Sequence, residues 1–276
     1  MDTPFVTTDW LASHLSDPNL VVVDGSWHMP NSSRNAQAEY LAGHIPGAVF
    51  FDIDAIADKS TDLPHMLPAP ADFARAVGAL GISDRSTIII YDELGLFSAP
   101  RVLWTFRIMG AKDVRILAGG GPKWRAEKRL IQTGAVKRNA AVFETNFNRK
   151  RVADFNTVRD RSHDHAAQIT DARPAPRFHA EVPEPRAGLK SGHIPNSKNV
   201  PVSLLSEDGQ LRSTAELQQI FADRQIDLGK PIITSCGSGI TASTLALALE
   251  VAGARDVAVY DGSWSEWGGR PDAEIE

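Results

Sequence analysis

Short runs of apolar, mostly β-branched residues recur along the chain and alternate with segments of helical apolar spacing. The runs are bounded by polar or glycine-containing turns, which is typical of buried strands. In residues 71–80, Phe73, Val77 and Leu80 fall on one face of a helix. Alternating strands and helices predict an α/β fold in which a parallel sheet is flanked by helices on both faces. The expected strands are residues 20–24, 49–51, 87–91, 114–117, 168–171 and 232–234, and the expected helices are residues 7–15, 37–41, 71–80, 99–109, 214–221 and 241–251.

The pattern of the first half returns in the second half. Gly43-His44-Ile45-Pro46 recurs as Gly192-His193-Ile194-Pro195, and Gly110-Ala111 recurs as Gly253-Ala254. Asn196 stands where the first copy has Gly47, and asparagine tolerates the left-handed backbone that such a turn needs. We therefore expect two tandem domains of the same fold: residues 1–134, a surface linker at 135–157, and residues 158–276.

Composition and charge restrict the partners. The formal net charge is −5 and there is no dense Lys/Arg block, which argues against nucleic acid or an anionic membrane. The basic residues of the linker are interpreted as a solvated connection. No apolar run approaches the ~20 residues that span a bilayer, and Met1–Pro4 lacks the basic start of a secretion signal. These observations predict a cytoplasmic protein without a membrane segment.

Cys236 is the only cysteine in 276 residues. A single cysteine rules out an internal disulfide and a multi-cysteine metal site, and we expect neither a metal nor a cofactor. His44 and His193 recur at matching turns, one in each domain, and are interpreted as structural turn residues.

The surroundings of Cys236 indicate a reactive thiol. A strand ends just before it, Gly237 and Gly239 follow it, and a helix is expected from Thr241, capped by Thr241 or Ser243. Loop amides and a helix N-terminus favour a thiolate anion. An inert buried cysteine is the alternative, but such a residue does not need two glycines and a helix start around it.

The repeat aligns Asp92 with Cys236. In both copies a β-branched strand precedes the residue and a glycine follows three positions later. A carboxylate cannot act as a soft nucleophile toward sulfur, so we expect the first domain to be catalytically silent.

Several motifs in register resemble the two-domain rhodanese sulfurtransferases over essentially the whole chain. Within that family, the loop Cys236-Gly-Ser-Gly-Ile-Thr241 is similar to that of the 3-mercaptopyruvate sulfurtransferases, whereas thiosulfate-preferring members carry basic residues just after the cysteine. The other matching residues are the two His-Ile-Pro turns, Phe51–Asp54, His65–Pro68, Phe97–Arg101 and Asp261–Trp264.

The resemblance implies an activity. Cys236 takes sulfur from 3-mercaptopyruvate as a persulfide, releases pyruvate, and passes the sulfur to a thiol, cyanide or a thioredoxin-like protein. It also implies a set of site residues. Arg177 and Arg186 bind the substrate, the amides of Gly237, Gly239, Ile240 and Thr241 hold the persulfide, and Ser238, His65 and Asp54 form a proton relay to which the first domain contributes His65 and Asp54.

Three other functions are alternatives to sulfur transfer from 3-mercaptopyruvate. A cysteine phosphatase requires Cys-x5-Arg, but position 242 is Ala, so that function is excluded. A thiosulfate sulfurtransferase remains the alternative within the family. A non-catalytic sulfur carrier or scaffold remains the alternative of another class, although it would have no need for Arg177 and Arg186.

Overall fold

A computed structural model describes residues 3–276. Met1 and Asp2, the first residues of the segment in which we expect no secretion signal, lie outside the described residues. The chain divides into two compact units. The first comprises residues up to 58, 67–148 and 208–210, and the second comprises residues 59–66, 149–207 and 211–276. His65 therefore groups with the unit that carries Cys236.

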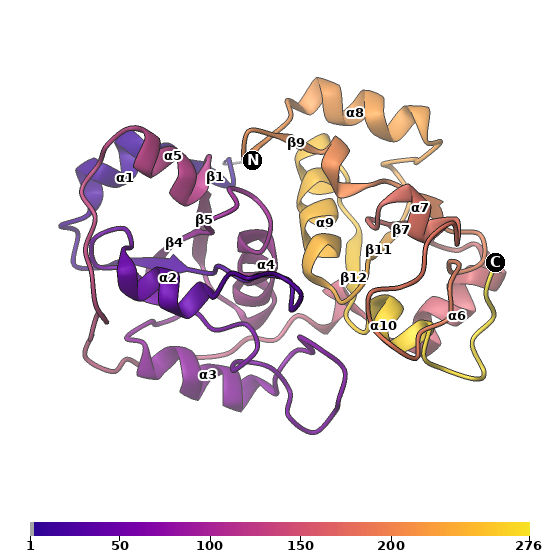
Figure 1. Ribbon diagram of the computed structural model, residues 1–276, viewed down its shortest axis with the longest axis horizontal. Coiled ribbons are helices and arrows are strands. Elements are labelled where there is room, and N and C mark those ends of the chain that lie inside the picture. Colours follow the sequence, from indigo (N-terminus) through magenta and orange to yellow (C-terminus); the bar gives the residue numbers. More distant parts are fainter. Residues whose placement is uncertain (1–2) are drawn as a thin grey trace. The chain divides into compact units, whose positions relative to one another are not determined.

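The first unit contains a five-stranded sheet in the order β1-β5-β4-β2-β3, and all its strands are parallel (Figure 1). The β-branched runs form its central strands, since parallel strands covered on both faces are apolar along their whole length. Its elements are β1 (Phe5–Val6), α1 (Thr8–His14), β2 (Leu20–Asp24), α2 (Ala36–Ala42), β3 (Val49–Phe50), α3 (Pro70–Ala79), β4 (Thr87–Tyr91), α4 (Ala99–Met109), β5 (Asp113–Leu117) and α5 (Gly120–Ala126).

The second unit repeats this architecture with a parallel sheet in the order β6-β12-β11-β7-β8. Each strand occupies the same place in the order as its counterpart in the first sheet, which confirms the predicted fold class. Its helices and sheet strands are η1 (Arg149–Arg151), β6 (Val152–Ala153), α6 (Phe155–Asp164), β7 (Gln168–Asp171), α7 (Ala175–Phe178), β8 (Lys198–Asn199), η2 (Val202–Leu204), α8 (Thr214–Asp223), β11 (Ile232–Ser235), α9 (Ile240–Ala252), β12 (Val257–Tyr260) and α10 (Ser263–Trp267); the short strands β9 (Ser206–Glu207) and β10 (Gln210–Leu211) form a separate two-stranded sheet.

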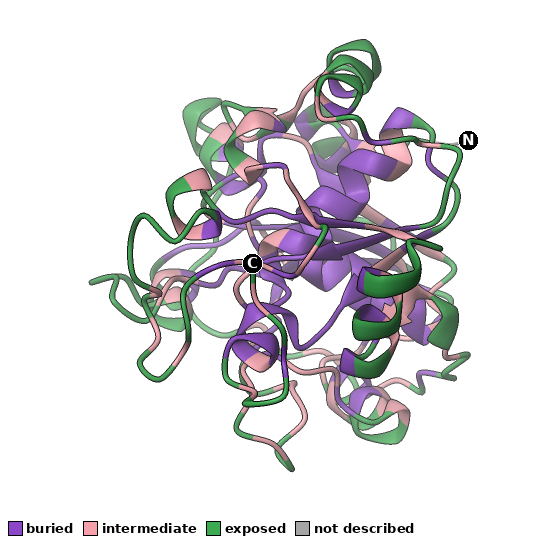
Figure 2. Cartoon of the chain, turned by 90° about the vertical axis from the view of Figure 1, so that its right-hand side faces the viewer, coloured by how far each residue is buried: buried purple, intermediate pink, exposed green. Residues whose placement is uncertain are grey.

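Each unit has its own apolar core. Val22, Ile89 and Trp124 belong to the cluster of the first unit, and Ile233 and Trp264 belong to that of the second. Figure 2 shows the strands buried and the helices exposing one face to solvent. α4 and α9 are exceptions. Every residue of α4 except Arg107 is buried, and in α9 Leu245, Leu247 and Leu249 are all buried although they lie on different sides of the helix.

The apolar pattern did not predict the edge strands β1, β6 and β8, which have two residues each and are too short to show a period. It also did not predict helix α6, whose ten residues are mostly polar. Within the expected linker, residues 149–157 form η1, β6 and the start of α6, and β6 pairs with β12. No described helix is long and apolar enough to cross a bilayer.

Candidate active site

Cys236 lies between β11 and α9, where β11 ends at the carboxyl edge of the second sheet. Its side chain is buried, and the backbone N–H of Gly239 donates a hydrogen bond to Sγ over 3.1 Å. Gly239 has φ 83°, a left-handed conformation that glycine adopts without steric cost. The sulfur therefore lies at the first turn of a helix, where the aligned peptide dipoles favour an anion.

The start of α9 differs from the prediction. Gly239 is the N-cap and no side chain caps the helix, so the expected cap by Thr241 or Ser243 is wrong. The Ser243 hydroxyl donates instead to the Gly239 carbonyl, 2.9 Å away. A capping hydroxyl would occupy first-turn amides; without one, these amides remain available to the sulfur.

Helix α10 holds the cysteine loop from one side. The N–H of Trp264 donates to the carbonyl of Cys236 over 2.9 Å, and both the N–H and the hydroxyl of Ser265 donate to the carbonyl of Gly237, over 2.9 and 2.6 Å. In a trans peptide the C=O and the next N–H point in opposite directions. The amides of Gly237 and Ser238 therefore point away from α10.

Two arginines approach the loop at Gly237. A Cβ atom at that position would lie 3.2 Å from Nη2 of Arg177 and 4.0 Å from Nη1 of Arg186. Gly237 has no positive φ, so a side chain here would not strain the backbone but would crowd Nη2 of Arg177. The structure thus brings together three of the predicted site elements: the cysteine loop, Arg177 from α7, and Arg186 from the segment after it.

The remaining predicted residues lie as follows. Ile240 and Thr241 open α9, where backbone amides have no acceptor within the helix. Ser238 is buried within the loop. His65 is also buried and has φ 63°, whereas Asp54 is exposed, belongs to the first unit, and accepts a hydrogen bond from Trp27 Nε1 over 2.9 Å.

Sequence reasoning missed three buried charged residues behind Arg177. Glu184 pairs with both Arg177 and Arg173, and Arg173 also pairs with Asp171. Arg173 stacks on Trp264, with its guanidinium carbon 4.2 Å from the ring centroid. One signal was present: Glu184 lies between two prolines directly before Arg186.

The matching loop of the first unit is filled by its own carboxylate. Asp92 is buried, and Oδ2 accepts hydrogen bonds from the amides of Phe97, Ser98 and Ala99 over 2.8–2.9 Å. Oδ1 accepts a fourth bond from Leu94 over 2.9 Å. The amides at the start of α4 thus surround a fixed carboxylate where the second unit has the thiol.

The two turn histidines have structural surroundings. The ring nitrogens of His44 lie 2.9 Å from the carbonyls of Ile45 and Gly134, and His193 Nδ1 lies 3.0 Å from that of Phe178. Among the residues described, no group of three or more His, Cys, Asp or Glu side chains could hold a metal ion.

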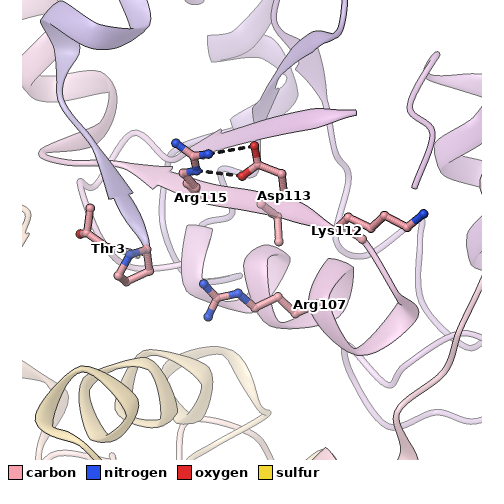
Figure 3. A pocket seen from close by; sticks show the side chains of 8 residues that line it. Thr3, Arg107, Lys112, Asp113 and Arg115 are labelled. Carbon is pink, nitrogen blue, oxygen red and sulfur yellow. Dashed lines mark hydrogen bonds and ion pairs between the residues drawn. The ribbon is translucent and has the colours of Figure 1, made fainter. Parts of the chain in front are cut away.

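A cavity of about 190 Å³ in the first unit is lined by Arg107 and by residues 111–115 (Figure 3). It lies beside the start of β5, the amino end of a strand, and the fork of Arg115 is paired with Asp113. Ligand sites of open parallel sheets form at the carboxyl ends of strands, so this cavity is separate from the candidate site.

A scan against known families matches the description "Rhodanese-like domain" to residues 7–127 and again to residues 154–270. The chain belongs to the rhodanese family and carries two of its domains. Among curated relatives, the 3-mercaptopyruvate sulfurtransferase of Escherichia coli (strain K12) is 48% identical over 275 residues, which cover 99% of this chain and 98% of the relative.

Other relatives and a solved structure agree with this placement. The thiosulfate sulfurtransferase of Rattus norvegicus is 42% identical over 270 residues, 95% of this chain and 91% of that protein. The crystal structure of SseA from Escherichia coli, described as a 3-mercaptopyruvate sulfotransferase, superposes with a TM-score of 0.89 at 46% identity and covers 95% of this chain and 99% of the other.

Proposed function

We propose that this protein is a sulfurtransferase that takes sulfur from 3-mercaptopyruvate onto Cys236. The observation that carries the proposal is the position of Gly237, which follows the thiol and where a Cβ atom would lie within 4.0 Å of two guanidinium groups. Arginine forks bind planar carboxylate and carbonyl oxygens. A substrate held by Arg177 and Arg186 would present its sulfur beside Cys236.

The reaction has two steps. The Cys236 thiolate attacks the substrate sulfur, so that an S–S bond forms and the C–S bond breaks; the substrate thiol proton ends on the methyl carbon of pyruvate. The loop amides stabilise the persulfide anion. In the second step an acceptor thiol, cyanide or a thioredoxin-like protein takes the outer sulfur and regenerates the thiolate. The single thiol suits the reducing cytoplasm, where we propose that the protein works.

A proton relay completes the proposal. Among the loop residues with a hydroxyl group, Ser238 is the nearest in sequence to Cys236. His65 groups with the same compact unit. We assign Ser238, His65 and Asp54 to transfer of the substrate thiol proton. Changing His65 to Ala should lower turnover with mercaptopyruvate; unchanged turnover would remove His65 from the mechanism.

Thiosulfate is the second candidate donor, because a thiosulfate sulfurtransferase is 42% identical to this chain. The loop argues against it as the preferred donor. Thiosulfate is a dianion whose leaving sulfite needs cations, whereas Gly237 and Ser238 supply amides and a hydroxyl without charge.

Mass spectrometry and kinetics test the proposal together. Incubation with mercaptopyruvate should add one sulfur atom to the wild-type protein and none to Cys236→Ser. A protein that gains no sulfur from either donor would be a scaffold. A larger kcat/KM for thiosulfate than for mercaptopyruvate would make it a thiosulfate sulfurtransferase.

A further inference from the structure

Four charged side chains form a continuous buried network in the second unit. Arg173 donates to Asp171 through Nε, its Nη2 lies 2.8 Å from Oδ2 of Asp171, and its Nη1 lies 2.8 Å from Oε1 of Glu184. Arg177 Nε lies 3.3 Å from the same oxygen, and Arg177 Nη2 bonds Oε2 of Glu184. The exposed fraction is 1% or less for the side chains of Asp171, Arg173 and Glu184, and 19% for Arg177.

Glu184 determines which edge of Arg177 is free. The Glu184 carboxylate bonds the side edge of the guanidinium, which is formed by Nε and Nη2. The end edge, formed by Nη1 and the second hydrogen of Nη2, is left for a ligand. Nη2 is also the atom that lies 3.2 Å from the Cβ position at Gly237. The guanidinium is therefore held with its end edge available beside the cysteine loop, and two bonds in a fork fix a plane as well as a distance.

Arg173 in turn fixes Glu184. A buried carboxylate is tolerated only when it is paired and hydrogen-bonded. Arg173 supplies one such bond, and its own position is set by Asp171, by the Gly192 carbonyl at 2.9 Å and by the face of Trp264. Trp264 donates its backbone N–H to the carbonyl of Cys236. One packed assembly thus supports both the thiol loop and the substrate arginine.

The charges of this network sum to zero, because two carboxylates offset two guanidinium groups. Arg177 therefore brings direction to the site but no net charge. A network without net positive charge favours a substrate with one carboxylate over a dianion.

We propose that Glu184 is a positioning and donor-selecting residue: it orients Arg177 for the mercaptopyruvate carboxylate and lowers the net charge of the site, which disfavours thiosulfate. This inference rests on the proposed function. If the wild-type protein gains no sulfur from mercaptopyruvate, the function itself fails, and Glu184 is then not under test.

The test is steady-state kinetics with both donors on Glu184→Gln, which keeps the shape but removes the charge. The ratio of kcat/KM for mercaptopyruvate to that for thiosulfate should fall about 10-fold, mainly through a higher KM for mercaptopyruvate, since one charge-assisted bond is weakened. Glu181→Gln is the matched control, because Glu181 is exposed in the same segment and its loss changes the total charge equally. It should leave the ratio at the wild-type value.

Two further variants separate positioning from a general structural role. Glu184→Asp keeps the charge but shortens the side chain, so the KM for mercaptopyruvate should rise while the KM for thiosulfate changes less than in Glu184→Gln. In an Arg177→Ala background, Glu184→Gln should add nothing to the KM for mercaptopyruvate, because Glu184 acts through Arg177. Equal losses with both donors, or a full additional effect without Arg177, would overturn the proposal.

Discussion

At the scale of single residues, the site depends on small side chains that leave room for large ones. Gly237 lacks a Cβ where Arg177 and Arg186 approach, and Gly239 adopts a φ that brings its amide to the sulfur of Cys236. The proposed chemistry thus depends on one nucleophile and two cations, each of which can be removed separately.

Cys236→Ser should abolish sulfur transfer and leave the fold intact. Serine retains an acceptor for the Gly239 amide but cannot form a persulfide, and it changes the buried volume by little. Transfer assays and a thermal melt measure the two effects. Transfer near the wild-type rate in the folded variant would contradict the mechanism.

Arg186→Ala should raise the KM for mercaptopyruvate by about 10- to 100-fold, since a charge-assisted hydrogen bond contributes roughly 1.5–3 kcal/mol. Thermal stability should change far less. Arg255→Ala is the control, because Arg255 is an exposed arginine of the same unit. If both variants keep the wild-type KM, Arg186 does not bind the carboxylate.

At the scale of elements, the two units carry the same strand–loop–helix, but its loop holds a carboxylate in the first unit and a thiol in the second. Both loops place a glycine of positive φ three residues after the key position, Gly95 at 98° and Gly239 at 83°. In the first unit four amides bond a fixed carboxylate, and in the second the amide of Gly239 bonds a sulfur atom. The loop of the first unit therefore keeps an anion-binding form, and we expect its carboxylate to serve stability.

Asp92→Asn tests that difference. The amide group keeps one oxygen but places N–H donors against backbone donors, so the free energy of unfolding should fall by about 2–3 kcal/mol, the scale of hydrogen bonds to a charged group. Urea unfolding measures the loss, and kcat of the folded variant should be unchanged. The exposed residue Asp256 provides a control, since Asp256→Asn should change stability by less than about 0.5 kcal/mol. An equally small loss in Asp92→Asn would mean that the carboxylate does not hold the loop.

At the scale of the whole molecule, the repeated strand ends differ in how they compensate a buried carboxylate. Asp171, at the end of β7, is paired with Arg173. Asp24, at the same place at the end of β2, accepts a hydrogen bond from the backbone N–H of Ser26, and Tyr91 and Glu93 are nearby; burial raises its pKa from 3.8 to about 6. The unfolded chain releases this proton near pH 4 and the folded protein near pH 6, so folding stability is lost as pH rises through that interval.

Asp24→Asn should therefore stabilise the protein at pH 8 but not at pH 4. The shift of about two pKa units corresponds to at most about 3 kcal/mol. Other carboxyl groups, such as Glu39 with its pKa lowered to about 2 beside Arg34, titrate in both proteins and cancel in the comparison. Urea unfolding at the two pH values measures the difference. A gain of the same size at both would show that Asp24 is not its source.

The sequence by itself determined the elements and the repeat. Strand runs such as residues 87–91, the alignment of Asp92 with Cys236, and the turn at Asn196, whose φ is 62°, were all readable because they depend on neighbours within a few positions. Periodicity and turn chemistry are local properties of the chain. The motif resemblance extended this reading to the two arginines.

Only the tertiary structure decided what surrounds those arginines and the thiol. Glu184 meets Arg173 across a loop, and Ser265 meets Gly237 from 28 residues away. The start of α9 also has no side-chain cap, and the amide of its N-cap residue Gly239 bonds the sulfur of Cys236. Such contacts result from the packing of whole elements, and no short stretch of sequence encodes them. The apolar pattern therefore predicts the scaffold and the position of the nucleophile, whereas the charge balance around the nucleophile exists only in the folded protein.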